Sequence, residues 1–271
     1  MKYPIEELAL TEFPRALKEI PQPPTTLNYR GQLPPSGIKL LSIVGSRKYT
    51  SYGKQVVDEL VAGLAGYPVG IVSGLALGID SLAHEAALKN NLYTLAIPGG
   101  GLADSVIYPR NHLSLAMRIL EAGGGLLSEF DPTFKATAWS FPKRNRLVAG
   151  ISLATLLIEA AEKSGTLITA RLATDYNREL LVVPGSIFSA TSAGTHQFLK
   201  LGATPVTTGA DILEVLGIAL QNETSIKPPS QLSPTENQVI DILTEPTHRD
   251  ELIRKLNLST AEATQLLMLM E

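Results

Sequence analysis

The chain has 271 residues, a formal net charge of −3 and no cysteine. Without cysteine, disulfides, thiolate metal sites and a cysteine nucleophile are all excluded. The slightly acidic balance excludes a protein covered in positive potential, and a hydrophobic content of 44% excludes a disordered chain.

Residues 1–34 are predicted to form an extended lead-in. The N-terminus carries charges throughout and lacks the apolar region of a signal peptide. No apolar run in the chain reaches the roughly 18 residues of a membrane span. The stretch PQPPTTLNYRGQLPPSG disfavours a helix because proline lacks a backbone N–H. Together with the absence of cysteine, these features fit a cytoplasmic protein.

Short apolar runs alternate with helical patterns between residues 35 and 217. The predicted strands lie at 39–45, 69–74, 93–100, 124–130, 152–160 and 179–185. The predicted helices include 53–65, 80–90, 111–123 and 166–177. Nearly continuous apolar strands between helices are typical of a parallel sheet that is covered on both faces. The predicted fold class is therefore α/β, with a Rossmann-like, doubly wound, mostly parallel sheet.

A polar segment at 218–232, which contains a Pro-Pro pair, is predicted to be a linker to a small second domain at 233–271. That domain shows three helical patterns, at 233–244, 248–256 and 259–270. The arrangement predicts a helix-turn-helix or winged-helix domain. We expect this domain to be incomplete, because the chain ends inside an apolar helix where a wing would follow.

Capping-box spacings support two of these helix starts, one at Ser233 with Glu236 and one at Ser259 with Glu262. The C-terminal domain is acidic, with a net charge of −4, so the remaining residues sum to +1. Because phosphate neutralisation dominates affinity for nucleic acid, such a site is expected in the larger domain.

Five predicted strand-to-helix junctions are rich in Gly, Ser or Thr. They lie at 44–53, 72–80, 97–101, 159–166 and 183–186. In a parallel sheet these junctions share the carboxyl edge, where such folds bind ligands. Helix starts offer free N–H groups to anions, and glycine allows a phosphate to come close. The glycines could instead only make tight turns, but five on one edge, with Arg47 in the first, favour an anion site.

The segment WSFPKRNRLVAG gathers cations and aromatic rings just before an apolar run. These residues are Trp139, Phe141, Lys143, Arg144 and Arg146. A single nucleic-acid strand offers phosphates to cations and base faces to aromatic rings. Cations in the first turn of a helix oppose its dipole, so an anionic partner explains them better than a solvated surface. For Trp139 we favour core packing over base stacking.

Other candidate groups point to structural roles. Asp80 is interpreted as the N-cap of the helix that follows it, and His84 as a structural residue rather than a ligand or base. His112 and His196 show no acid–His–Ser spacing. No P-loop pattern occurs, and SGLALGID only loosely resembles a dinucleotide fingerprint. We therefore expect no cofactor, metal site or catalytic residue.

Six blocks in order resemble the DNA-processing protein A family, also called Smf. They are GSRKYTSYG, SGLALGIDSLAH, LAIPGGGLADSVIYPRNH, FPKRNRLVAGIS, EAAEKSGTLITARLA and VPGSI. The resemblance covers about residues 20 to 215. It implies a cytoplasmic bacterial protein that binds single-stranded DNA and loads the recombinase RecA onto it in natural transformation and recombination. It also implies a homodimer through the Rossmann-like domain, no nucleotide cofactor and no catalytic turnover.

The residues expected to bind the strand come from three junctions and the cationic segment. They are Arg47, Ser73, Gly74, Phe141, Lys143, Arg144, Asn145, Arg146, Ser164, Gly165 and Thr166. The cations are assigned to phosphates, Asn145 to hydrogen bonding and Phe141 to stacking, worth about 1–3 kcal/mol per base. Residues 164–166 would add backbone donors from another helix start.

Two other functions remain open. A phosphoribohydrolase-like enzyme on a related fold also has a Pro-Gly-Gly-Gly loop, but its motif continues to a glutamate, whereas PGGGLADSVIYP carries only Asp104. A transcription factor would bind duplex DNA through residues 233–271, whose acidic charge opposes that role. We expect that domain to contact protein instead.

Overall fold

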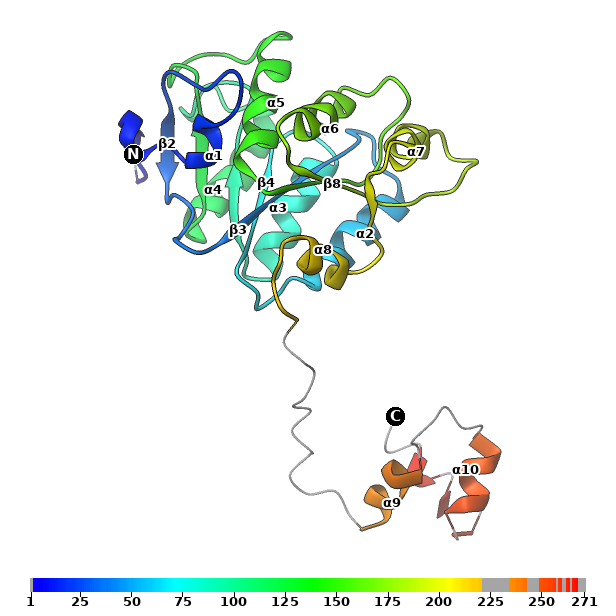
Figure 1. Ribbon diagram of the computed structural model, residues 1–271. Coiled ribbons are helices and arrows are strands. Elements are labelled where there is room, and N and C mark those ends of the chain that lie inside the picture. The colour runs from blue at the N-terminus through cyan, green and yellow to red at the C-terminus, as the bar shows by residue number, and fades with distance from the viewer. Residues whose placement is uncertain are drawn as a thin grey trace. The chain divides into compact units, whose positions relative to one another are not determined.

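The computed structural model describes residues 2–220, 234–242, 249–256, 258, 259, 262, 263 and 265–267. The chain divides into two units, Met1–Leu220 and Gln221–Glu271. The larger unit is a sheet with helices on both faces (Figure 1). The predicted linker lies outside the described residues from 221 onward, as does Ser233.

Nine strands form the sheet of the larger unit, in the order β1-β2-β6-β5-β4-β3-β7-β8-β9. Their bounds are Ile5–Glu7 (β1), Asn28–Gly31 (β2), Lys39–Val44 (β3), Val69–Ser73 (β4), Tyr93–Ala96 (β5), Gly125–Ser128 (β6), Ala154–Leu157 (β7), Glu179–Val182 (β8) and Thr204–Pro205 (β9). Strands β3 to β9 pair in parallel, whereas β1 and β2 are antiparallel at one edge. The predicted α/β class with a mostly parallel sheet is confirmed.

Helices cover both faces because neighbouring strand residues are buried on opposite sides. Leu40 and Leu41 of β3 belong to different apolar clusters. The α-helices are Arg15–Lys18 (α1), Ser51–Ala62 (α2), Ile79–Lys89 (α3), Leu113–Glu121 (α4), Ser140–Ile151 (α5), Thr166–Asp175 (α6), Ala193–Lys200 (α7) and Gly209–Val215 (α8). Helices α2, α3 and α8 pack on one face, and α1, α5, α6 and α7 on the other (Figure 1).

Three short 3-10 turns complete the larger unit, at Leu10–Glu12, Arg110–His112 and Ala190–Ser192. Helix α4 packs against β6 through a third, smaller apolar cluster. No helix within residues 2–220 or the described C-terminal segments is long and apolar enough to cross a membrane.

Residues 2–34 differ from the extended lead-in that the prolines suggested, because they contain β1, β2 and α1. Strand β2 pairs with β6 from Asn28 to Gly31 and so extends the sheet. Arg30 is 1% exposed, and its guanidinium lies 2.5 Å from the Asp104 carboxylate. Its Nε also donates to the Tyr3 carbonyl at 3.0 Å. These long-range contacts make the segment part of the domain.

The C-terminal unit contains the helices α9, Pro234–Ile242, and α10, Arg249–Lys255. An apolar cluster that includes Val239, Leu252 and Leu267 holds its described segments together. The capping box predicted at Ser259 is present: its N–H donates to a Glu262 carboxylate oxygen at 3.1 Å, and its hydroxyl accepts from the Glu262 N–H at 3.4 Å.

Candidate functional site

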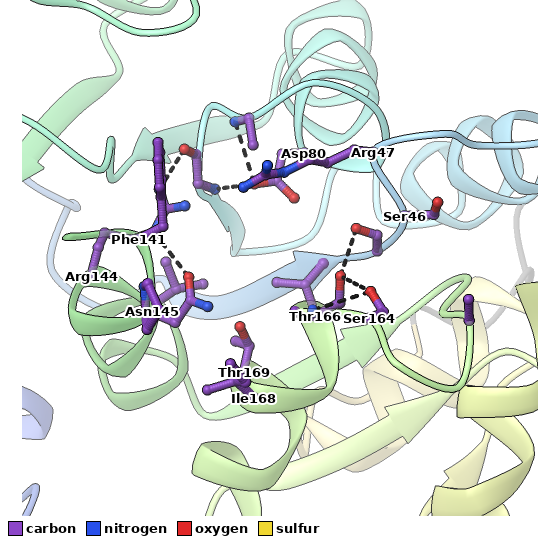
Figure 2. Close-up of a pocket in the computed structure, with 18 of the residues that line it drawn as sticks. Ser46, Arg47, Asp80, Phe141, Arg144, Asn145, Ser164, Thr166, Ile168 and Thr169 are labelled. Atoms are coloured by element: carbon purple, nitrogen blue, oxygen red, sulfur yellow. Dashed lines mark hydrogen bonds between the residues drawn. The ribbon is translucent and has the colours of Figure 1, made fainter. Parts of the chain in front are cut away.

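A pocket of about 800 Å³ opens at the carboxyl ends of β3 and β7. From β3 the chain adds β4, β5 and β6 in turn on one side of β3. After α5 it crosses back and adds β7 on the other side of β3. The pocket therefore lies at the topological switch point, the usual ligand position in such sheets. Its walls come from residues 44–48, 74–80, 138–148 and 161–169, together with Thr191 (Figure 2).

One wall of the pocket pairs a cation with an aromatic ring. The guanidinium carbon of the exposed Arg47 lies 5.4 Å from the centroid of the Phe141 ring, and the centroid of the Tyr108 ring lies 5.9 Å from that of Phe141. Gly99 makes room for Phe141, since a Cβ there would lie 2.5 Å from the ring. The pocket thus presents a positive charge beside a π-face that is itself partly exposed.

Glu159 holds the loop that carries Arg47. Its buried carboxylate accepts from the Thr50 N–H at 3.0 Å, the Thr50 hydroxyl at 2.6 Å and the Thr191 hydroxyl at 3.1 Å. A Cβ at Gly53 would lie 2.3 Å from this carboxylate. The N-terminus of α2 is therefore occupied by a carboxylate of the chain itself, a favourable position for a negative charge.

Asp80 and Arg144 join the loop after β4 to α5. The Asp80 carboxylate accepts from the N–H groups of Gly74 at 3.1 Å and Ala76 at 3.4 Å. The Arg144 guanidinium donates to the Gly74 carbonyl at 2.5 Å (Figure 2). It also donates to the Ile97 carbonyl. The N-cap interpretation of Asp80 is wrong, because Gly78 is the N-cap of α3 and the Asp80 carboxylate bonds back to the preceding loop.

Burial governs the ionisation of both groups. It raises the pKa of Asp80, against the opposing effect of the Arg144 charge and the two amide donors. It lowers the pKa of Arg144 to about 10, so the guanidinium remains charged at neutral pH. The pocket floor therefore holds a fixed positive charge whose partners are carbonyl oxygens and a buried carboxyl group.

Ser164 and Thr166 tie the start of α6 to the end of β3. The Thr166 hydroxyl donates to the Gly45 carbonyl at 2.9 Å, and its N–H donates to the Ser164 hydroxyl at 3.2 Å (Figure 2). A Cβ at Gly165 would meet no atom within 4 Å, so the backbone there faces open space. This wall combines exposed backbone with small hydroxyl groups.

Eight of the eleven expected strand-binding residues line this pocket. They are Arg47, Gly74, Phe141, Arg144, Asn145, Ser164, Gly165 and Thr166. Lys48 and Asp80 also line it and were not assigned to it from the sequence. Lys48 follows Arg47 directly, so the adjacent cations in GSRK could have assigned Lys48 to the pocket from the sequence.

Ser73, Lys143 and Arg146 lie elsewhere. Ser73 is buried and donates to the Ile43 carbonyl at 2.7 Å. Arg146 is buried against the Glu129 carboxylate, and it donates to the Gln22 carbonyl at 2.6 Å. Lys143 lies 3.3 Å from the same carboxylate. At about 100° per helical residue, positions 143 and 146 of α5 point away from the face that carries 141, 144 and 145.

Trp139 is 56% exposed, so the expectation of core packing is wrong. The indole lies at the N-terminus of α5, with its centroid 5.6 Å from the ring of Phe134 and 5.8 Å from that of Phe130.

Two of the five junctions expected to attract anions use glycine for close packing instead. Residues 98–101 are buried beneath the segment that precedes α5: a Cβ at Gly100 would lie 2.9 Å from the Phe134 carbonyl, and one at Gly101 would lie 2.2 Å from the Asp131 carbonyl. A Cβ at Gly185 would lie 2.1 Å from the Ser192 hydroxyl. Only the junctions after β3, β4 and β7 line the pocket.

The described histidines occupy separate structural positions. The buried His84 is hydrogen-bonded to the Thr94 hydroxyl at 2.7 Å, as a structural residue would be. His112 bonds to the Leu75 carbonyl at 2.9 Å, and His196 to the Gly185 carbonyl at 3.1 Å. Within the described ranges, no group of three His, Asp or Glu side chains could hold a metal ion.

His84 makes the stability of the domain depend on pH. Burial lowers its pKa to about 3, below the ordinary value of 6.5. Between these values the unfolded chain binds a proton that the folded chain does not, so the free energy of unfolding falls as pH falls below 6.5. We expect a loss of about 2 kcal/mol between about pH 7 and about pH 5, measured by urea denaturation. The variant His84→Gln should lose correspondingly less; an equal loss in both proteins would contradict this assignment.

The chain matches two family models. Residues 8–217 match the model described as DNA recombination-mediator protein A, and residues 223–271 match the DprA winged helix domain. Protein Smf of Escherichia coli strain K12 is 41% identical over 218 residues, which are 80% of this chain and 55% of that protein. The chain thus spans little more than half the length of this relative.

Two solved structures resemble the larger unit. The X-ray structure of DNA processing protein A from Streptococcus pneumoniae has a TM-score of 0.72 and 35% identity, and covers 79% of this chain and 74% of that one. The structure of DNA processing protein A from Helicobacter pylori has a TM-score of 0.69 and 30% identity, and covers 79% and 96%. The latter concerns a unique single-stranded DNA binding mode of that protein.

Proposed function

The chain belongs to the DNA recombination-mediator protein A family, and from this premise we propose that it binds single-stranded DNA in the pocket at the carboxyl edge of its sheet. The observation that carries the proposal is the pairing of Arg47 with the Phe141 ring at the mouth of the switch-point pocket. Arg47 and Phe141 both lie at the position where doubly wound parallel sheets bind their ligands.

The chemistry of the pocket fits a strand better than an isolated anion. Its lining carries three cations, Arg47, Lys48 and Arg144, against one carboxyl group, Asp80. A phosphate would pair with the exposed Arg47 and Lys48, while an unpaired base would stack on Phe141. In a duplex the base faces are already stacked, so the ring contact favours single-stranded DNA.

The remaining pocket residues have supporting roles in this proposal. The Asn145 amide and the backbone at Gly165 would donate hydrogen bonds to phosphate or base edges, whereas the Ser164 and Thr166 hydroxyls already donate within the protein and shape this wall. Arg144, which is buried and donates to two carbonyl groups, acts as a positioning residue that adds positive potential from below. Ser73 and Arg146 are left out because their polar groups are already bonded within the protein.

Family membership also supports a proposal for the cellular role of the protein. We place the protein in natural transformation and recombination in the bacterial cytoplasm, as a homodimer that loads RecA onto single strands. Three strongly exposed apolar residues flank α7, namely Ile187, Phe188 and Leu201, and support a protein interface on the Rossmann-like domain. We assign DNA binding to residues 35–217 and protein contact to the acidic domain at 233–271. RecA nucleation on strands coated with single-strand-binding protein would test the loading step.

The structure weakens the alternative of a nucleotide-cleaving enzyme. Asp104, the carboxylate in the segment that follows the Pro-Gly-Gly-Gly loop, is paired with the buried Arg30 and does not line the pocket. Asp80 does line it, but its carboxyl group is engaged by two loop amides and its raised pKa reflects burial. Strand binding therefore accounts for the pocket better than hydrolysis.

Fluorescence anisotropy with a labelled single-stranded oligonucleotide tests the proposal. We expect saturable binding that weakens steeply with salt, by a slope of about −0.7 in log affinity per neutralised phosphate. Unlabelled single strand should compete well, whereas duplex and mononucleotide should compete poorly. Preferential binding of mononucleotide with release of free base would instead support the enzyme, and absence of strand binding would reject the proposal.

A further inference from the structure

An exposed aromatic platform lies outside the pocket, at the N-terminus of α5. It consists of Phe130, Phe134 and Trp139. The first two rings are stacked with centroids 4.8 Å apart, and Trp139 packs edgewise on Phe130 at 5.8 Å. Phe130 is buried, whereas Trp139 is 56% exposed, so the indole packs on a buried ring and leaves part of its own surface accessible. A large ring held in this way is available to a partner.

Hydrogen bonds hold the loop that carries Phe134, the ring beneath the indole. The Asp131 carboxylate accepts from the N–H and the hydroxyl of Thr133, at 2.8 and 2.6 Å. The carbonyls of Pro132 and Phe134 accept from the N–H groups of Ala103 and Gly101, at 2.9 and 2.8 Å. The loop that carries Phe134 is therefore fixed against the buried glycines at 100 and 101. A rigid ring loses little conformational entropy when a ligand stacks on it.

Charge complementarity points to an anionic ligand. The Lys143 ammonium lies 5.3 Å from the centroid of Phe130 and 5.8 Å from that of Trp139, and its side chain is 45% exposed. Lys135 is exposed in the same segment. Two acidic groups lie nearby: the Glu129 side chain is 6% exposed and is shared with Arg146 and Lys143, and Asp131 is bonded to Thr133. Residues 129–146 hold four cations against these two acids.

The platform is adjacent to the pocket along α5. Ala138 lines the pocket, Trp139 follows it, and Phe141 lines the pocket again. Because residues two apart on a helix point to nearly opposite sides, Trp139 and Phe141 lie on opposite sides of the helix N-terminus. A strand that leaves the pocket over this end would pass the positive end of the helix dipole and then reach the indole.

We propose that Trp139 is a second base-stacking residue, which takes the base of a nucleotide just outside the pocket, with Lys143 as the cation for its phosphate. This inference rests on the proposed single-strand binding. It gives Lys143 a role outside the pocket. It also accounts for an exposed indole beside a lysine, since stacking platforms with adjacent cations are how proteins follow a single strand.

The test uses the fact that the chain has one tryptophan, so emission excited at a wavelength that tyrosine does not absorb reports on this position alone. Unlabelled oligo(dT) of about 16 nucleotides, a length that exceeds one small binding site, should quench the emission as it saturates the protein. In parallel, anisotropy of the labelled strand should show Trp139→Ala binding at least about fivefold more weakly than wild type, and Trp139→Phe close to wild type. Leu153→Ala, which truncates another exposed apolar residue, serves as the matched control.

The outcomes separate this inference from the proposed function. Tight, salt-sensitive binding by anisotropy, with unchanged tryptophan emission and a Trp139→Ala variant that binds like wild type, would overturn the second stacking residue and leave the pocket site standing. Absence of strand binding in the wild type would overturn both. A change of emission with purified RecA but not with oligo(dT) would make the platform a protein-docking surface and also overturn the inference.

Discussion

Replacing Arg47 by alanine is expected to weaken single-stranded DNA binding about tenfold to a hundredfold. The substitution removes an exposed cation at the pocket mouth and its contact with the Phe141 ring, 5.4 Å away. A hydrogen bond to a charged group contributes about 1.5–3 kcal/mol, and each tenfold change corresponds to about 1.4 kcal/mol. The salt slope of log affinity should also become shallower by about 0.7, because one phosphate contact is lost. Anisotropy at several salt concentrations measures both quantities.

Two control variants separate a local contact from a general loss of charge. Arg171→Ala removes one exposed cation of α6 that does not line the pocket, and should bind nearly as wild type does. Arg47→Lys keeps the charge but not the planar guanidinium, and should fall between wild type and alanine. If Arg47→Ala and Arg171→Ala weaken binding equally, the pocket mouth is not the phosphate site.

Replacing Gly78 by alanine is expected to abolish most strand binding and to lower the free energy of unfolding by about 2–4 kcal/mol. Gly78 has a φ of +88°, which alanine adopts only with strain. The new Cβ would also lie 2.2 Å from the Ser46 carbonyl and 2.6 Å from the Arg47 Cα. The loop after β3 would have to move, and with it the side chain of Arg47. Anisotropy and urea denaturation on the same preparation measure the two effects.

Gly66→Ala provides the matched control for this substitution. Gly66 has a similar φ of +81°, but a Cβ there would meet no atom within 4 Å. It should therefore carry only the backbone strain, about 1 kcal/mol, and bind the strand normally. Normal strand affinity in Gly78→Ala would show that the position of the Arg47 loop does not matter for binding.

The fold class could be predicted because it depends on local patterns. Strands such as β3 and β4 are buried on both faces, and their apolar runs are visible in the sequence without knowledge of any partner. The edge strands β1 and β2 and the two-residue β9 could not be predicted in the same way. Their position depends on pairing with β6 and β8, and the contacts that hold β2, such as Arg30 with Asp104, join residues far apart in the chain.

The candidate site could be predicted in part for a related reason. Parallel strands place their carboxyl ends at one edge, so the junctions after β3, β4 and β7 could be assigned to a common ligand edge. Helix periodicity could also have separated positions 143 and 146 from positions 141, 144 and 145, since it follows from spacing alone. The pairing of Lys143 and Arg146 with the Glu129 carboxylate could not be predicted from spacing, because Glu129 comes from another part of the fold.

By itself, the sequence determined the α/β class, the ligand edge and the cations and aromatic residues available there, because each depends on residue type and local periodicity. The tertiary structure alone decided how those residues are used. It turned Arg146 toward Glu129, placed Arg144 under the pocket beside Asp80 and left Trp139 exposed. It also buried the glycines of residues 98–101 beneath a loop. Burial and charge pairing depend on which segments meet in space, and residue spacing does not encode those distances.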